Sequence, residues 1–150
     1  MIYISHRGNL DEPQPEKENH PEYIMKAWRQ GFDVELDVWH LDGKFILGHD
    51  QPQYEVDWKF LTNASFWCHA KNIQALPALI NCGAHCFWHE TDYATLTTRG
   101  FIWTYPGNEL TKMSVCVMPE SHGHEYFIKQ PWVGSHGVCS DFVKEIRDGK

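Results

Sequence analysis

Residues 32–39 read Phe-Asp-Val-Glu-Leu-Asp-Val-Trp, and the fold can be worked out from this stretch. Apolar and acidic residues alternate along it, which is typical of a β-strand because successive side chains of a strand point to opposite faces. The alternation predicts a strand with one apolar face and one carboxylate face. An Asp42-Gly43 turn follows, so residues 44–47 are expected to double back as a hairpin partner that ends at Gly48-His49-Asp50.

Short apolar runs and helical segments alternate in the rest of the chain. Residues 2–5 begin an apolar strand pattern, and a short amphipathic helix is expected over 21–30, ended by Gly31. Further strands are expected over 65–70, 85–89, 101–105, 114–118 and 137–140, and further helices over 73–82 and 141–147. Strands that alternate with helices favour a parallel α/β arrangement. No shift in composition marks a boundary, so residues 1–150 are expected to form a single domain.

The composition excludes several classes of protein. With 42% hydrophobic and 14% aromatic residues, the chain can build a packed core and does not resemble a disordered one. Its 13 Lys and Arg against 20 Asp and Glu give a net charge of −7, so we expect no general binding to nucleic acid. No apolar run approaches the ~18 residues of a membrane span, so we expect no span. The N-terminus carries no basic segment followed by an apolar one, which favours a cytoplasmic protein.

Glu35 and Asp37 form the most informative pair in the predicted strand. They point to the same side about 7 Å apart, and carboxylate oxygens at that spacing can bind one hard divalent cation. The alternative is a strand whose polar face is simply exposed to solvent. His6-Arg7-Gly8 comes directly after the first strand, where parallel α/β sheets place their binding loops. The hairpin returns His49 toward Asp37, so two imidazoles able to exchange protons near neutral pH would lie by the carboxylates.

Four motifs in the first 50 of the 150 residues resemble one known family. In chain order they are His6-Arg7-Gly8, Glu18-Asn19, Glu35-Leu36-Asp37-Val38 and Gly48-His49-Asp50. As a set they resemble the signature of the glycerophosphodiester phosphodiesterase family, whereas each motif alone is unspecific. Later landmarks of that family are matched more loosely, by Lys71, Trp103-Thr104 and Ser140-Asp141.

The resemblance implies a TIM-type β/α barrel with a divalent metal ion on Glu35 and Asp37. A full barrel needs ~250 residues, and this chain of 150 residues leaves only about 19 for each of eight units. We therefore expect a reduced barrel of seven or eight mainly parallel strands, with short or missing helices. A second subunit that covers an incomplete wall would make the protein a homo-oligomer.

The resemblance also implies a role for each site residue. His6 and His49 would be the catalytic acid–base pair, and Arg7 and Lys71 would hold the substrate phosphate. His69 stands where the family usually has a glutamate as the third metal ligand. An imidazole at that position shifts the preference from calcium or magnesium toward manganese or zinc. The expected cofactor is therefore one divalent ion: Mg, Ca or Mn, or Zn because of the imidazole of His69. The alternative for His69 is an ordinary half-buried strand histidine that binds no metal.

The expected function is that of a metal-dependent phosphodiesterase. It would hydrolyse a small-molecule glycerophosphodiester, such as a deacylated phospholipid, to glycerol 3-phosphate and an alcohol. One alternative is a phospholipase D-type phosphodiesterase similar to the sphingomyelinase D group, against which the lack of a secretion signal and of a disulfide pattern counts. The other is a non-catalytic protein that binds metal and phosphate on the same fold. Two histidines count against it, because binding alone needs no acid–base pair.

Three further groups of residues are candidates for a role. The first group offers zinc ligands: Cys82, His85, Cys86 and His89. Its spacing fits no standard zinc motif, and the five cysteines of the chain are expected to be reduced thiols. Residues 103–105 could form an aromatic wall for the substrate or could belong to the core. Glu90 or Glu120 could replace the missing third carboxylate, the alternative being a solvated strand end.

Overall fold

The computed structural model describes residues 1–149, which form a mixed α/β fold with little helix. Its strands lie in one sheet: β1 (Ile2–His6), β2 (Asp33–Leu41), β3 (Lys44–Leu47), β4 (Tyr54–Val56), β5 (Phe66–Ala70), β6 (Cys86–Phe87), β7 (Ala94–Leu96), β8 (Ile102–Thr104), β9 (Ser114–Val117) and β10 (Gly137–Ser140). Its helices are short: α1 (Pro21–Arg29), α2 (Trp58–Leu61), α3 (Ala75–Cys82), the 3-10 helix η1 (Pro119–His122), α4 (His124–Ile128) and α5 (Val143–Asp148).

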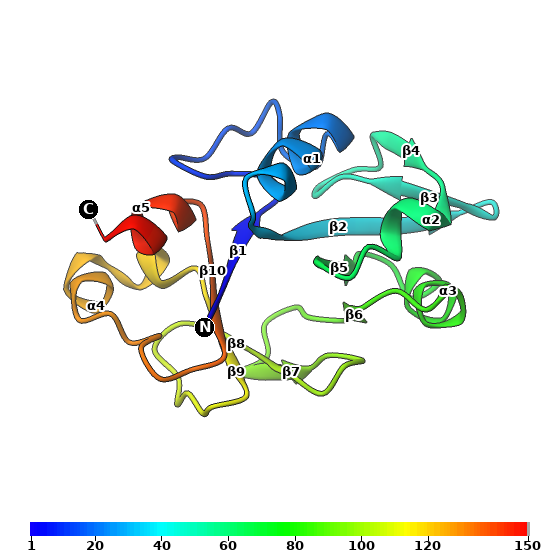
Figure 1. Ribbon diagram of the computed structural model, residues 1–150. Coiled ribbons are helices and arrows are strands. Elements are labelled where there is room, and N and C mark those ends of the chain that lie inside the picture. Colours follow the sequence, from blue (N-terminus) through cyan, green and yellow to red (C-terminus); the bar gives the residue numbers. More distant parts are fainter. Residues whose placement is uncertain (150) are drawn as a thin grey trace.

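The sheet curls around its own interior, and its parallel strands follow one another in chain order (Figure 1). Going round the curl, the parallel neighbours are β6, β5, β2, β1, β10, β9 and β8. Antiparallel strands extend this set, because β3 pairs with β2, β4 with β3 and β7 with β8. The first and last strands of the chain are thus direct neighbours. The predicted α/β class is confirmed. The sheet forms a partial barrel that contains both parallel and antiparallel strand pairs.

Most predicted elements are confirmed within one or two residues. The strand predicted over 32–39 is β2, and its hairpin with β3 pairs Leu41 with Lys44 and Val38 with Leu47. The strand predicted over 85–89 is reduced to the two residues of β6. The structure adds β4, β7, α2, η1 and α4, which have only three to five residues each. Elements this short leave no readable periodicity in a sequence.

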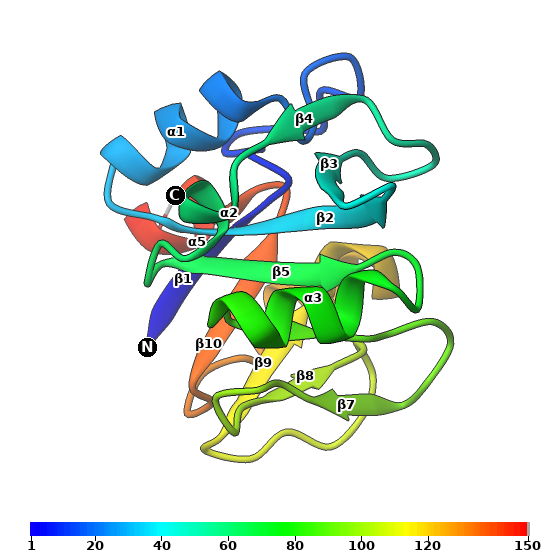
Figure 2. The same cartoon turned by 90° about the vertical axis from the view of Figure 1, so that its right-hand side faces the viewer.

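The two faces of β2 serve different purposes. Val34 and Leu36 point outward and pack with Ile24 of α1 in the outer core. Helices α1 and α3 cover this side of the sheet (Figure 2). The opposite face carries Glu35 and Asp37 into the curl, where their exposed fractions are 2% and 0%. The alternative of a solvent-facing carboxylate strand is therefore wrong.

The interior of the curl is layered, because side chains two residues apart share one face of a strand. The lower layer is apolar: Ile4, Trp67, Phe87, Trp103, Val115, Val117 and Cys139. Two positions further along four of these strands, toward their carboxyl ends, the residues are His6, His69, His89 and Asp141. Parallel barrels place their functional groups at this end of the strands. A polar layer thus lies over an apolar floor.

His85 is buried at the apolar end of the interior. Its ring lies 4.2 Å from the Trp67 ring, and its Nε2 is 2.8 Å from the Thr97 hydroxyl. Burial, and then the charges of Arg99 and His136, lower the pKa of His85 from 6.5 to about 4. Between pH 6.5 and pH 4, the His85 side chain binds a proton in the unfolded chain but not in the folded chain. The free energy of unfolding therefore falls as the pH drops through this range.

We expect His85→Gln to make the protein less sensitive to acid. Between pH 7.5 and pH 5, the wild type should lose about 2 kcal/mol of stability through this residue, and the variant should not. Urea unfolding at both pH values measures the difference, with His124→Gln at an exposed histidine as the control. An equal acid-induced loss in wild type and His85→Gln would contradict the assignment.

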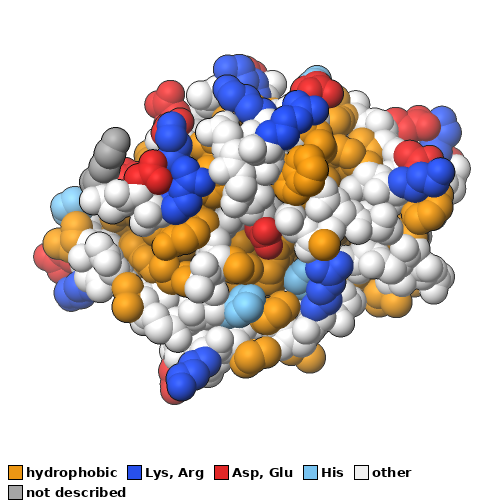
Figure 3. Space-filling model, in the orientation of Figure 1, with side chains coloured by type: hydrophobic (Ala, Val, Ile, Leu, Met, Phe, Trp, Pro, Cys, Tyr) orange, Lys and Arg blue, Asp and Glu red, His pale blue; other side chains and the backbone are white. Residues whose placement is uncertain are grey.

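Charged side chains of both signs share the surface of the molecule. On the face shown in Figure 3, lysines and arginines around the rim lie beside acidic side chains. The longest helix, α1, has nine residues. Within residues 1–149, none of the helices has the length and apolar character needed to cross a bilayer.

Candidate functional site

One cavity of about 470 Å³ opens at the polar layer of the interior. It brings together six of the seven predicted site residues: His6, Arg7, Glu35, His49, His69 and Lys71. Asp37, the seventh, is fully buried beside them, 3.3 Å from His69 Nδ1 and 3.6 Å from Lys71 Nζ. The rest of the wall is largely aromatic and apolar, and includes His89, Trp103, Tyr105, Val117 and Met118.

Strand register brings the three candidate metal ligands together. Asp37 is paired with His69 across β2 and β5, and Glu35 with His6 across β2 and β1. One ligand atom each of Glu35, Asp37 and His69 lie within 4.8 Å of one another. Glu35 Oε2 and Asp37 Oδ1 are buried without a hydrogen-bond partner in the described chain. Such oxygens are costly to bury alone, so this cluster could hold a metal ion.

His69 presents its Nδ1 to the two carboxylates. Its Nε2 donates to the carbonyl oxygen of His89 at 2.8 Å, because a carbonyl can only accept. Nδ1 then faces Asp37 Oδ1 at 3.3 Å and Glu35 Oε1 at 3.7 Å. Burial opposes the charged imidazole, but Asp37 and Glu35 outweigh it and raise the pKa of His69 to about 9. The position strongly attracts positive charge, and the carbonyl fixes the ring as ligand histidines are fixed in metal sites.

Asp37 is surrounded by donors and cations. Arg7 Nε lies 2.9 Å from its Oδ2, and the Asn19 amide donates to the same oxygen at 2.9 Å. Asn19 also accepts the backbone N–H of Asp37 at 2.8 Å. Burial alone would raise the pKa of Asp37, but His69, Arg7 and Lys71 hold it far below its usual range. The carboxylate therefore stays ionised with Oδ1 turned toward His69 and Lys71.

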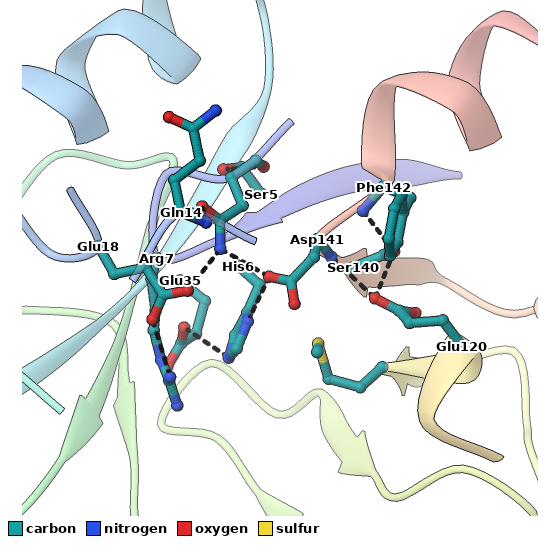
Figure 4. Close-up of polar contacts among 12 residues, drawn as sticks. Ser5, His6, Arg7, Gln14, Glu18, Glu35, Glu120, Ser140, Asp141 and Phe142 are labelled. Carbon is teal, nitrogen blue, oxygen red and sulfur yellow. Dashed lines mark hydrogen bonds and ion pairs between the residues drawn. The ribbon is translucent and has the colours of Figure 1, made fainter. Parts of the chain in front are cut away.

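His6 is oriented by a carboxylate from the end of β10. Its Nδ1 donates to Asp141 Oδ1 at 2.7 Å (Figure 4). The Asn9 amide donates to the same oxygen at 2.8 Å. Burial alone would lower the pKa of His6, but the bond to Asp141 and the charge of Glu35 raise it above its ordinary value. The other ring nitrogen, Nε2, is left facing the cavity and lies 3.9 Å from Glu35 Oε2.

Glu120 supports Asp141 from behind. Its Oε1 accepts from the Ser140 hydroxyl at 2.8 Å and from the Asp141 backbone N–H at 2.9 Å (Figure 4). Burial raises the pKa of this carboxyl group. Glu120 therefore holds the strand end that carries Asp141 and does not join the cluster of candidate metal ligands. Glu90, the other suggested substitute for the third carboxylate, is exposed at the wall of the cavity.

His49 reaches the cavity from the end of the hairpin. The N–H of Gly48 donates to the Asp37 carbonyl at 3.1 Å, which holds this end against β2. Gly48 has φ +148°, and a side chain there would collide with the Gln51 carbonyl oxygen, so glycine is required. His49 Nδ1 donates to Asp50 Oδ1 at 2.7 Å. Both candidate catalytic histidines thus have a carboxylate on Nδ1, with His49 the more exposed of the two.

Arg7 adopts a left-handed backbone with φ 53°. This conformation is uncommon outside glycine and clusters at functional sites. The Arg7 N–H donates to the Glu35 carbonyl at 2.9 Å, and its Nη1 donates to Glu18 Oε2 at 3.1 Å (Figure 4). The Asn9 amide donates to the other Glu18 oxygen at 2.9 Å. Glu18 and Asn19 therefore orient Arg7 and Asp37, and belong to the support of the site.

The suggested zinc ligands do not converge. Cys86 packs in the outer core, whereas His85 bonds Thr97 inside the curl and His89 lines the cavity. Alternation along the strand sends Cys86 to the face opposite the two histidines. Trp103 and Tyr105 both line the cavity, the place expected for an aromatic wall, and Trp103 also belongs to the buried apolar layer, the other alternative.

The sequence does not predict the roles of Asn9 and His89. Asn9 is fully buried directly after the His6-Arg7-Gly8 turn, and that position is its only signal. The His89 side chain is 4% exposed, and neither ring nitrogen has a hydrogen-bond partner within residues 1–149. Burial, and then the charge of His69, lower the pKa of His89 to about 4, so its ring is neutral near pH 7. The sequence pattern that could have identified His89 is strand alternation, which puts it two positions after Phe87 and on the same face.

The site can therefore bind positive charge on a carboxylate and imidazole cluster, bind an anion with an arginine and a lysine, and exchange protons through two oriented imidazoles. A second hollow of about 500 Å³ lies elsewhere, along the N-terminal loop and α1, and holds none of these groups. Comparisons of the chain with protein-family profiles, with curated proteins and with solved structures find no match.

Proposed function

We propose that the protein is a metal-dependent phosphodiesterase of the glycerophosphodiester phosphodiesterase type on a reduced TIM-type barrel. The observation that supports this best is one cavity in which two carboxylate-paired histidines, two cations and a three-ligand cluster meet. The substrate would be a glycerophosphodiester, and the products glycerol 3-phosphate and an alcohol. The run of parallel neighbours in chain order, with polar groups at their carboxyl ends, agrees with such a barrel.

The residues fit a divalent cation as the cofactor. Glu35, Asp37 and His69 offer two carboxylates and one imidazole, and two of the carboxylate oxygens are buried without a partner in the described chain. A bound cation would supply positive charge that stabilises the negative charge growing on the phosphate. The mixed oxygen and nitrogen donor set suits manganese or zinc better than an all-oxygen set does.

His6 and His49 would move the two protons of hydrolysis. One imidazole takes a proton from a water molecule while the water oxygen bonds to phosphorus. The other imidazole gives a proton to the departing alkoxide as the phosphorus–oxygen bond to the alcohol breaks. The carboxylate on each Nδ1 keeps its ring oriented. Arg7 and Lys71 hold the phosphate oxygens and offset their charge.

Turnover should depend on metal. We expect glycerol 3-phosphate to be released from glycerophosphocholine or glycerophosphoethanolamine, to stop after treatment with a chelator, and to return with manganese or zinc. Glu35→Gln should abolish both turnover and the response to metal, because it removes one of three ligands. Glu55→Gln, at a carboxylate paired with Lys44 on the surface, is the matched control and should behave as the wild type.

Silence with Mg, Ca, Mn and Zn alike would contradict the enzymatic proposal. Calorimetry would then decide whether the cavity binds Mn²⁺ and glycerol 3-phosphate without turning anything over. Binding of both, lost in Glu35→Gln and kept in Glu55→Gln, would assign the cavity to a non-catalytic metal and phosphate site.

A further inference from the structure

The backbone of His89 takes part in the site, but its side chain makes no hydrogen bond in the described chain. Its carbonyl oxygen accepts from His69 Nε2 at 2.8 Å, which ties this point of the chain to the metal cluster. The side chain points into the interior two positions after Phe87 and lines the same cavity as His6 and Lys71. Carbonyl and side chain can thus be separated by mutation, because every substitution keeps the carbonyl.

The imidazole of His89 lacks the partners that a buried ring needs. Both of its nitrogens are buried without a hydrogen bond in the described chain, and the nearest carboxylate oxygen, Asp92 Oδ2, is 3.9 Å from Nδ1. Leaving such groups unpaired costs free energy. With no bond to hold it, the ring can turn about its broad χ2 torsion toward a ligand in the cavity.

The chemistry around His89 restricts what this ligand group can be. A neutral imidazole offers one donor and one acceptor, and a hydroxyl is a small group that can satisfy either. The ring packs 4.4 Å from the Tyr105 ring, so the wall on that side of His89 is aromatic. A trimethylammonium group neither donates nor accepts, and it would leave both nitrogens unpaired.

We propose that His89 is a specificity-determining residue that binds a free hydroxyl on the organic part of the phosphate ester. The assignment rests on the proposed function for the place of the phosphate, which Arg7 and Lys71 would bind in the same cavity. His89 would then select esters whose alcohol carries a hydroxyl over esters of plain alkyl alcohols.

Calorimetry with two phosphate esters of equal chain length tests this assignment without turnover. In the presence of Mn²⁺, the wild type should bind glycerol 3-phosphate about 10- to 100-fold more tightly than propyl phosphate. His89→Phe should reduce this ratio to near one and leave propyl phosphate binding unchanged, whereas His89→Gln should retain part of the preference. His136→Phe removes a histidine that is stacked on Phe101 outside the cavity, and it should keep the full ratio.

The imidazole signals of the wild type provide a second measurement that needs no folded variant. The His89 signal should shift in NMR spectra with glycerol 3-phosphate and stay in place with propyl phosphate. Equal binding of the two esters, binding of neither, or an unshifted signal overturns the proposal. If the preference depends on His89 but the protein hydrolyses no phosphodiester, the role of His89 is kept and the phosphodiesterase function is rejected. If the protein hydrolyses phosphodiesters but shows no such preference, the phosphodiesterase function is kept and the role of His89 is rejected.

Discussion

His6→Gln should lower kcat for phosphodiester hydrolysis by about 10²- to 10⁴-fold and leave KM nearly unchanged. The histidine is nearly buried, and its Nδ1 is committed to Asp141, so only Nε2 can exchange a proton with a reacting group. Glutamine occupies a similar volume and can still donate to Asp141, but it cannot carry a proton back and forth. The loss would therefore lie in the chemical step rather than in binding.

Two comparisons make this experiment specific to His6. His124→Gln changes an exposed histidine outside the cavity and should keep wild-type kcat. Asp141→Asn disturbs the orientation of the ring without removing it, so its kcat should fall less than that of His6→Gln. Mn²⁺ binding should be equal in all of these variants, because none of them removes a cluster ligand. A His6→Gln protein with more than a tenth of wild-type kcat would remove His6 from the proton transfers.

The sequence predicts the parts of the fold that local chemistry decides. Alternation over 32–39 and the Asp42-Gly43 turn are enough for β2 and its hairpin, because neighbours in the chain are also partners in the sheet. The pairing of β1 with β10 joins strands from the two ends of the chain, so no pattern of neighbouring residues predicts it. The two-residue strand β6 is held by its place beside β5 rather than by its own pattern.

The same division holds within the site. Glu35 and Asp37 are predictable because a strand sends them to one side, and His69 and Lys71 share a side for the same reason. The partner of His6 is 135 positions away in the chain, so the ring's orientation follows only from the β1–β10 pairing. The residues that hold Arg7 and Asp37 in place, such as Glu18 and Asn19, lie in a loop whose position depends on the tertiary fold.

His69→Glu should change which metal the cluster prefers. The wild-type set of two carboxylates and an imidazole should favour manganese or zinc, whereas a set of three carboxylates should favour calcium or magnesium. We expect affinity for Ca²⁺ or Mg²⁺ to rise about tenfold or more and affinity for Zn²⁺ to fall by a similar factor. Competition against Mn²⁺, followed by the electron paramagnetic resonance of the free ion, gives all of these affinities on one scale.

The control for this variant is His69→Gln, which removes the imidazole and adds no charge. It should weaken the binding of every metal and produce no new preference. If the ratios among the affinities for the four metals are the same in the wild type and in His69→Glu, then His69 is not a ligand, and the cluster would be reduced to its two carboxylates.

Stability gives His69→Glu a second readout. In the wild type, His69 Nε2 donates to the His89 carbonyl, and a carboxylate at the same place cannot donate. The variant also places a third negative charge within reach of Glu35 and Asp37. Both changes should lower its Tm in the presence of a chelator, and Ca²⁺ should raise that Tm by more than it raises the Tm of the wild type, because a cation offsets the repulsion among three carboxylates.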